Sequence, residues 1–292
     1  MYIMKIINPW LKLDRKLFPE RLCWLKDNME QQKNNFKIVS DKKARMILPN
    51  AITLIGVCIG LTSIKFAIDG KFAIAVIAIL FAGLMDALDG RIARLIKGTS
   101  KMGKELDSLG DVISFGVAPA LIMYFWNLQY LEKLGWFVCL IYVVCVALRL
   151  ARFNVNSDEE PSWKDNFFEG MPSPAGGIIV LMPLVLSYSG IGKFFFEINY
   201  DLLVPTSFIL VSILLISTIP TYSFKKIVIP RAMTKFLLFG IVLFFGALLV
   251  YTFKILAVSS LVYLCLIPVS YFHYKKIKKE KNITSDKDEG LE

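Results

Sequence analysis

Residues 72–111 read FAIAVIAILFAGLMDALDGRIARLIKGTSKMGKELDSLGD, and this stretch decides the fold. It opens with an apolar run that ends in Asp86 and Asp89, and after a Gly-Thr-Ser turn it continues to Asp107 and Asp111. An apolar helix that reaches this turn and a second helix that leaves it form a hairpin, which brings the two acidic pairs together. Carboxylates at a membrane edge are costly, so we predict that the hairpin carries a functional site.

The spacing of these four aspartates predicts a metal site. Residues three or four apart share one face of a helix, so Asp86 pairs with Asp89 and Asp107 pairs with Asp111. Four like charges near a lipid phase would repel one another unless hard divalent cations neutralised them. We therefore expect the four carboxylates to bind two divalent ions, Mg²⁺ or Mn²⁺.

The residues between the acids fit an anionic substrate. Gly90 and Gly103 leave the backbone accessible, Ala93 keeps the same surface low, and Arg91 and Arg94 place positive charge one turn from the acids. Carboxylates that hold metal beside cations that hold phosphate indicate transfer of a phosphate-containing group. Direct in-line displacement assisted by two metal ions needs no covalent nucleophile.

Composition places this site in a membrane protein. The chain has 292 residues, 55% of them hydrophobic, and a mean hydropathy of +0.56. These values predict an all-α, polytopic membrane helix bundle. We expect about eight transmembrane helices, at 48–67, 72–97, 106–130, 135–153, 174–191, 202–219, 234–252 and 255–273.

Basic residues orient this bundle and exclude other functions. Most of the 34 lysines and arginines flank one side of the expected spans, which the positive-inside rule makes cytoplasmic, together with both termini and the acidic site. The exceptions are Lys65, Lys71, Lys133, Lys193 and Lys254. No nucleic-acid-binding motif accompanies the net charge of +10, so we expect no nucleic-acid partner. The single histidine, His273, excludes a histidine-based catalytic triad.

The pattern D-x-x-D-G-x-x-A-R, eight residues, then G-x-x-x-D-x-x-x-D resembles the signature of the CDP-alcohol phosphatidyltransferases. The resemblance implies a six-helix core, a CDP-linked lipid as donor, CMP as leaving group and a homodimer. It also implies that Asp86, Asp89 and Asp107 are the principal metal ligands and that Asp111 deprotonates the acceptor alcohol. Whether Asp111 is base, ligand or both stays open.

With this core, four segments are expected. Residues 1–47 form a basic cytoplasmic segment with an amphipathic run on the membrane surface, or alternatively a disordered lead-in. The phosphatidyltransferase core spans 48–219, additional C-terminal transmembrane helices span 220–273, and a charged, disordered cytoplasmic tail spans 274–292.

Segments around the motif bear on the acceptor. They are P-N-A-I-T-L at 49–54, V-I-S-F-G-V-A-P-A at 112–120, A-L-R-L-A-R-F-N at 147–154 and G-M-P-S-P-A-G-G at 170–177. Together they resemble the integral-membrane phosphatidylserine synthases of bacteria. The resemblance implies transfer of the phosphatidyl group from CDP-diacylglycerol to L-serine.

The residues themselves offer contacts for such an acceptor. Arg149 and Arg152 could bind the serine carboxylate, although anchoring of a helix end is the alternative role. Asn154 and Ser173 could add polar contacts, or could be ordinary caps.

The first expected span adds further polar and small residues. Asn50 and Thr53 share one face at its start and could reach the CDP-lipid, or could cap and back-bond their own helix. The G-x-x-x-G of Gly56 and Gly60 allows close helix approach and gives weak local support for a homodimer.

Two alternative functions remain at this point. The same chemistry could serve glycerol 3-phosphate, inositol phosphate or choline, of which the phosphorylated acceptors need an additional cationic pocket and choline an aromatic or acidic one. A divalent-cation transporter would also contain intramembrane acids, but these would line a path across the bilayer. Here the acids cluster at one end.

Overall fold

The computed structural model describes residues 41–96, 100–156, 167–190, 199–222 and 234–288. The first half is α3 (Asp41–Ile68), α4 (Phe72–Leu95), α5 (Lys101–Asp111), the π-helix η2 (Val112–Val117), α6 (Ala118–Trp126), the 3₁₀ turn η3 (Leu128–Leu131) and α7 (Glu132–Asn156). The second half is β1 (Phe167–Glu169), α8 (Ser173–Val180), α9 (Met182–Ser189), α11 (Tyr200–Ile216), β2 (Pro220–Tyr222), α12 (Thr234–Val250) and α13 (Thr252–Asp288).

The expected all-α membrane bundle is confirmed. Each of the eight apolar segments predicted from the sequence is helical in the described ranges. Five helical stretches there are long and apolar enough to cross a bilayer: Ile47–Ile68, Phe72–Leu95, Lys101–Trp126, Leu128–Val155 and Thr252–Lys275. The expected span at 174–191 is instead two short helices, because Pro183 lacks the N–H that a continuous helix needs.

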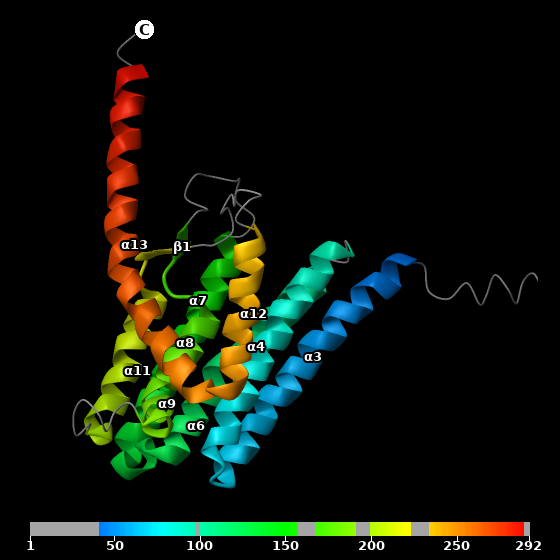
Figure 1. The fold of residues 1–292 in the computed structure, drawn as a ribbon, viewed down its shortest axis with the longest axis vertical. Coiled ribbons are helices and arrows are strands. Elements are labelled where there is room, and N and C mark those ends of the chain that lie inside the picture. The colour runs from blue at the N-terminus through cyan, green and yellow to red at the C-terminus, as the bar shows by residue number, and fades with distance from the viewer. Residues whose placement is uncertain (1–40, 97–99, 157–166, 191–198, 223–233, 289–292) are drawn as a thin grey trace, which may run out of the picture.

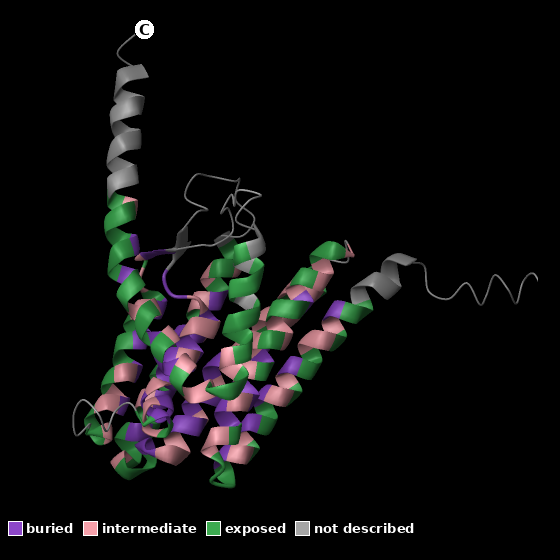
Figure 2. Ribbon diagram, viewed as in Figure 1, coloured by how far each residue is buried: buried purple, intermediate pink, exposed green. Residues whose placement is uncertain are grey.

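The helices run as a bundle in which α3 and α4 lie side by side as an antiparallel pair (Figure 1). Buried residues concentrate where α6, α7, α8, α9 and α11 meet (Figure 2). At the centre, Tyr142 of α7 and Phe208 of α11 are fully buried and pack edge to face with ring centroids 5.3 Å apart. This core holds α11 against α7, and α7 in turn packs against the π-helix that follows the acidic site.

The outer surface of the bundle is apolar. Leu140, Val144 and Leu148 of α7 are 45–54% exposed, and α12 shows an almost continuous exposed face (Figure 2). Such a surface is stable against lipid tails rather than water. The chain is therefore an integral membrane protein.

Gly56 and Gly60 are covered inside the chain. A methyl group on Gly56 would lie 3.4 Å from Met85 Cβ in α4, and one on Gly60 would lie 2.7 Å from Ser114 Oγ in η2. The close helix approach expected of this motif is thus made within one molecule. It gives no support to the expected homodimer.

Gly60→Ala is expected to lower the melting temperature, with a cost of about 1–3 kcal/mol, because the new methyl group would lie 2.7 Å from Oγ and 3.2 Å from Cα of Ser114. Gly240→Ala in α12 is the matched control, since nothing lies within 4 Å of its added methyl group. Thermal unfolding of the purified protein followed by fluorescence checks this. Equal melting temperatures for the two variants would contradict the packing at Gly60.

Two features depart from the sequence expectations, and a third expectation cannot be compared with the described residues. The strands β1 and β2, which no sequence pattern predicted, pair antiparallel with Phe168 opposite Thr221. The tail expected to be disordered from residue 274 instead continues α13 as a helix to Asp288. The amphipathic run expected within 1–47, from Trp10 to Leu25, lies outside the described residues and stays a prediction.

Candidate active site

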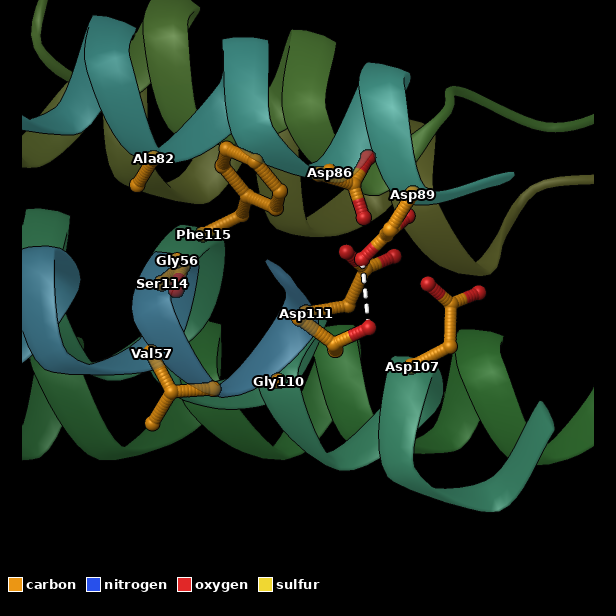
Figure 3. Close-up of a pocket in the computed structure, with 11 residues that line it drawn as sticks. Gly56, Val57, Ala82, Asp86, Asp89, Asp107, Gly110, Asp111, Ser114 and Phe115 are labelled. Atoms are coloured by element: carbon orange, nitrogen blue, oxygen red, sulfur yellow. Dashed lines mark hydrogen bonds between the residues drawn. The ribbon is translucent and has the colours of Figure 1, made fainter. Parts of the chain in front are cut away.

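The two acidic pairs meet as expected. Asp86 and Asp89 point from α4 toward α5, and Asp107 and Asp111 point back from α5 (Figure 3). Carboxylate oxygens of Asp86, Asp89 and Asp107 lie within 4.8 Å of one another, whereas Asp111 does not belong to this trio. Three of the acids thus form one group, and the fourth, Asp111, lies at its side next to Asp86.

The trio suits a hard divalent cation. All its donor atoms are carboxylate oxygens, the ligands that Mg²⁺ and Mn²⁺ prefer. Asp89 is only 2% exposed, and its Oδ1 is buried without a hydrogen-bond partner among the described residues. A cavity of about 10 Å³ between the acids is about the size that one water molecule needs. Buried anionic oxygens around so small a space fit a bound cation better than a solvated surface.

Thr53 supports the trio from α3. Its hydroxyl donates to Asp89 Oδ2 at 2.5 Å, the hydrogen bond drawn in Figure 3, and also lies 3.1 Å from the carbonyl oxygen of Pro49 in its own helix. The alternative back-bonding role is thus present together with a contact to the acidic site. Thr53 orients Asp89 so that its second oxygen stays available.

Close approach of α5 to α3 depends on small residues. Ser100 caps α5 by accepting a hydrogen bond from the Gly103 amide at 2.9 Å, and a methyl group on Gly103 would lie 2.9 Å from Asn50 Oδ1. A methyl group on Gly110 would lie 3.1 Å from Val57 Cγ2. Glycine at both positions lets α5 pack closely against α3.

A second cavity, of about 240 Å³, opens beside the trio. Thr53, Asp89 and Asp107 line both this cavity and the small cavity between the acids. It contains most of the residues predicted to bind the CDP-lipid: Asn50, Thr53, Gly90, Ala93, Arg94 and Gly103. Lys104 lines it too, a residue that the sequence analysis did not single out although it directly follows Gly103. Two basic side chains next to three acids give this cavity the means to hold a metal-bound anion.

The two arginines of the motif differ in position. Arg94 lines the second cavity and its Nε donates to the carbonyl oxygen of Gly90 at 3.0 Å, so the side chain folds back over that glycine. Arg91 is exposed and lines neither cavity. A substrate contact through Arg91 stays a prediction.

A π-helix follows Asp111 directly and is held from several sides. The Tyr142 hydroxyl donates to the Phe115 carbonyl oxygen at 2.7 Å, and methyl groups on Gly116 and Gly177 would meet Val146 and the Phe115 backbone at 3.3 and 3.1 Å. A π-turn widens the helix and changes which residues face one side, and such turns are frequent at functional sites. Sequence reasoning missed Tyr142 because no motif marks a π-helix.

The four residues expected to bind the acceptor lie at the same end of the bundle, but they have different hydrogen-bond partners. Arg149 donates to the Ser173 hydroxyl, which is fully buried, and lies close enough to Asp111 to interact electrostatically. Arg152 donates instead to the carbonyl oxygen of Ile216 at 2.8 Å, at the end of α11. Asn154 donates to Ser108 Oγ at 3.0 Å, between Asp107 and Asp111 on α5.

Comparison with known proteins agrees with this site. The family model for CDP-alcohol phosphatidyltransferase matches residues 46–219. A CDP-diacylglycerol–serine O-phosphatidyltransferase of Mycobacterium tuberculosis is 36% identical over 247 residues, covering 82% of this chain and 84% of that protein. A protein of the same name from Helicobacter pylori is 36% identical over 62% of this chain and 74% of its own length. The chain belongs to the CDP-alcohol phosphatidyltransferase family.

Proposed function

We propose that this protein is a CDP-diacylglycerol–serine O-phosphatidyltransferase, which transfers a phosphatidyl group from CDP-diacylglycerol to L-serine and releases CMP. The observation that carries the proposal is the convergence of two carboxylate pairs beside a basic cavity at one end of a membrane bundle. The relatives that carry this activity in their names support serine as the acceptor.

The donor would bind in the second cavity. Asp86, Asp89 and Asp107 would hold the divalent ions, with Asp111 at their side as a second-ion ligand, a base, or both. When bound, these ions neutralise the diphosphate and the charge that develops on the leaving CMP. Arg94 and Lys104 would contact the remaining phosphate oxygens, and Gly90, Ala93 and Gly103 would leave room for the nucleotide.

Asp111 would take the proton of the attacking hydroxyl. It lies between the metal-binding trio and Arg149, so an acceptor whose carboxylate pairs with Arg149 would place its hydroxyl near Asp111. The hydroxyl would then attack the phosphorus in line with the departing CMP. This arrangement needs no lipid-enzyme intermediate.

The same proposal includes the location of the enzyme. The acidic site and the basic loops lie on the cytoplasmic side of the inner membrane, and both termini face the cytoplasm, in keeping with the positive-inside rule. In Figure 1 the end of α4, the end of α7 and the end of α13 lie at one end of the bundle. Homodimerisation, which the family resemblance implies, is part of this proposal.

A CMP-release assay on the purified full-length protein tests the function. CDP-diacylglycerol with L-serine and Mg²⁺ or Mn²⁺ should yield phosphatidylserine and CMP, and glycerol 3-phosphate, inositol phosphate and choline should not replace serine. If CMP were released with one of these acceptors and not with serine, the assignment of serine as acceptor would be wrong, but phosphatidyl transfer would still be the reaction. Divalent-cation flux in proteoliposomes without CMP release would overturn both in favour of a transporter.

Arg149→Gln is expected to raise the serine KM about 10- to 100-fold, because it removes a charge-assisted contact to the carboxylate. Arg152→Gln is the matched control on the same helix. It should leave the serine KM within about threefold and lower the melting temperature, since Ile216 loses its hydrogen-bond donor. The serine KM and the melting temperature of each variant distinguish a residue that binds the carboxylate from one that anchors the helix end. An unchanged serine KM in both variants and in the double variant would refute a carboxylate site here.

A further inference from the structure

The last helix, α13, lies outside the residues that the family model matches, yet it is attached to the end of the bundle that holds the acidic site. The Ser270 hydroxyl donates to the carbonyl oxygen of Pro220 in β2 at 2.9 Å. In β2 the buried Thr221 donates to the carbonyl oxygen of Gly170 at 2.7 Å. Gly170 lies three residues before Ser173, the partner of Arg149. The helix is thus linked through β2 to the segment expected to bind the acceptor.

Tyr263 extends from α13 to this region. Its hydroxyl lies beside Thr221 and close enough to Arg149 for an electrostatic interaction. The hydroxyl is buried, and it forms no hydrogen bond of good geometry with any residue that the structure describes. A buried tyrosine hydroxyl normally has a partner.

Two further buried atoms around Arg149 share this condition. Nε of Arg149 itself and Oδ1 of Asp111 also lack a hydrogen-bond partner within the described ranges. Each such atom destabilises the folded protein when it stays unpaired. One of these three unpaired atoms is on Arg149, and the other two are on residues that interact with it electrostatically. Together they indicate that a polar ligand binds among them.

The chemistry of the three atoms specifies the ligand. Nε of Arg149 can only donate, the Tyr263 hydroxyl can donate, and a carboxyl oxygen of Asp111 can accept. A carboxylate accepts two hydrogen bonds at once, and an alcohol donates one. A small hydroxy acid, or an amino acid with a hydroxyl side chain, therefore satisfies all three, with its carboxylate on the arginine and tyrosine and its hydroxyl on the aspartate.

We propose that Tyr263 is an acceptor-binding residue, which holds the carboxylate of the acceptor together with Arg149. The inference rests on the proposed function, because it assigns a residue to the acceptor side of that reaction. It gives the C-terminal extension a role in acceptor selection. An acceptor without a carboxylate would leave both Tyr263 and Arg149 unpaired and would bind less well.

Tyr263→Phe tests this in the full-length enzyme, because it keeps the ring and removes the hydroxyl alone. The serine KM should rise about 5- to 20-fold, and the KM for CDP-diacylglycerol should stay within about twofold. The melting temperature should change little, since the hydroxyl makes no hydrogen bond of good geometry with the residues that the structure describes. Tyr271→Phe is the matched control on the same helix, at a side chain that is 44% exposed, and should change neither KM.

L-Serinamide gives a second readout, because it lacks the carboxylate. As a competitor of serine it should bind the wild-type enzyme more weakly than serine does, and Tyr263→Phe should narrow this difference. If wild-type enzyme makes no phosphatidylserine, the proposed function fails. If the wild type is active and Tyr263→Phe leaves the serine KM unchanged, lowers only kcat, or raises both KM values alike, the role of Tyr263 is refuted and the function stands.

Discussion

Asp86→Asn, Asp89→Asn and Asp107→Asn are each expected to reduce kcat about 10³-fold or more. The amide keeps the shape of the side chain but removes the negative charge that holds a divalent cation, and a bound cation contributes several kcal/mol to such a reaction. CMP release at saturating CDP-diacylglycerol and serine, measured over a range of Mg²⁺ and Mn²⁺ concentrations, checks this. Glu105→Gln is the matched control, because Glu105 is an exposed carboxylate on α5 that lines neither cavity.

Thermal unfolding tests the same prediction without turnover. In a chelator the three variants should melt no lower than the wild type, because each removes a like charge from a crowded site. Added Mg²⁺ or Mn²⁺ should stabilise the wild type and Glu105→Gln, and stabilise the three variants much less. A variant with near-normal turnover and a normal metal response would not have lost a ligand.

Asp111→Asn should lose about 10²- to 10⁴-fold in kcat, the range expected for loss of a general base. The metal-dependent rise in melting temperature and the affinity for CDP-diacylglycerol should stay near the wild-type values, because Asp111 is not part of the trio whose oxygens lie within 4.8 Å. This contrast separates a base from a ligand. If the metal response of Asp111→Asn collapses as in the trio, Asp111 acts mainly as a metal ligand.

The acidic site could be predicted from the sequence because the residues that form it are close together in the chain. Aspartates three and four apart must share a helix face, and a short turn between two apolar helices must return the chain to the same membrane edge. The convergence of Asp86, Asp89 and Asp107 therefore followed from spacing alone. The glycines at 90 and 103 followed from the motif in the same way, and both line the second cavity.

The acceptor region shows where this reasoning ends. Arg149 and Arg152 are three residues apart on one helix, with the same side chain and the same local pattern. Only packing against α11 distinguishes them. Arg152 donates a hydrogen bond to the carbonyl oxygen of Ile216, whereas Arg149 lies within electrostatic range of Asp111. Tyr263 is 114 positions further along the chain than Arg149 and has no motif around it.

The sequence by itself determined the membrane bundle, the hairpin and the four acids, because hydrophobicity and helical period act between near neighbours. The tertiary structure alone decided that Gly56 and Gly60 pack inside the chain, that a π-helix follows Asp111, and that a tyrosine of the last helix lies within electrostatic range of Arg149. These features depend on contacts between segments far apart in the chain. Their energies come from close packing and from burial of polar groups, which no local pattern records.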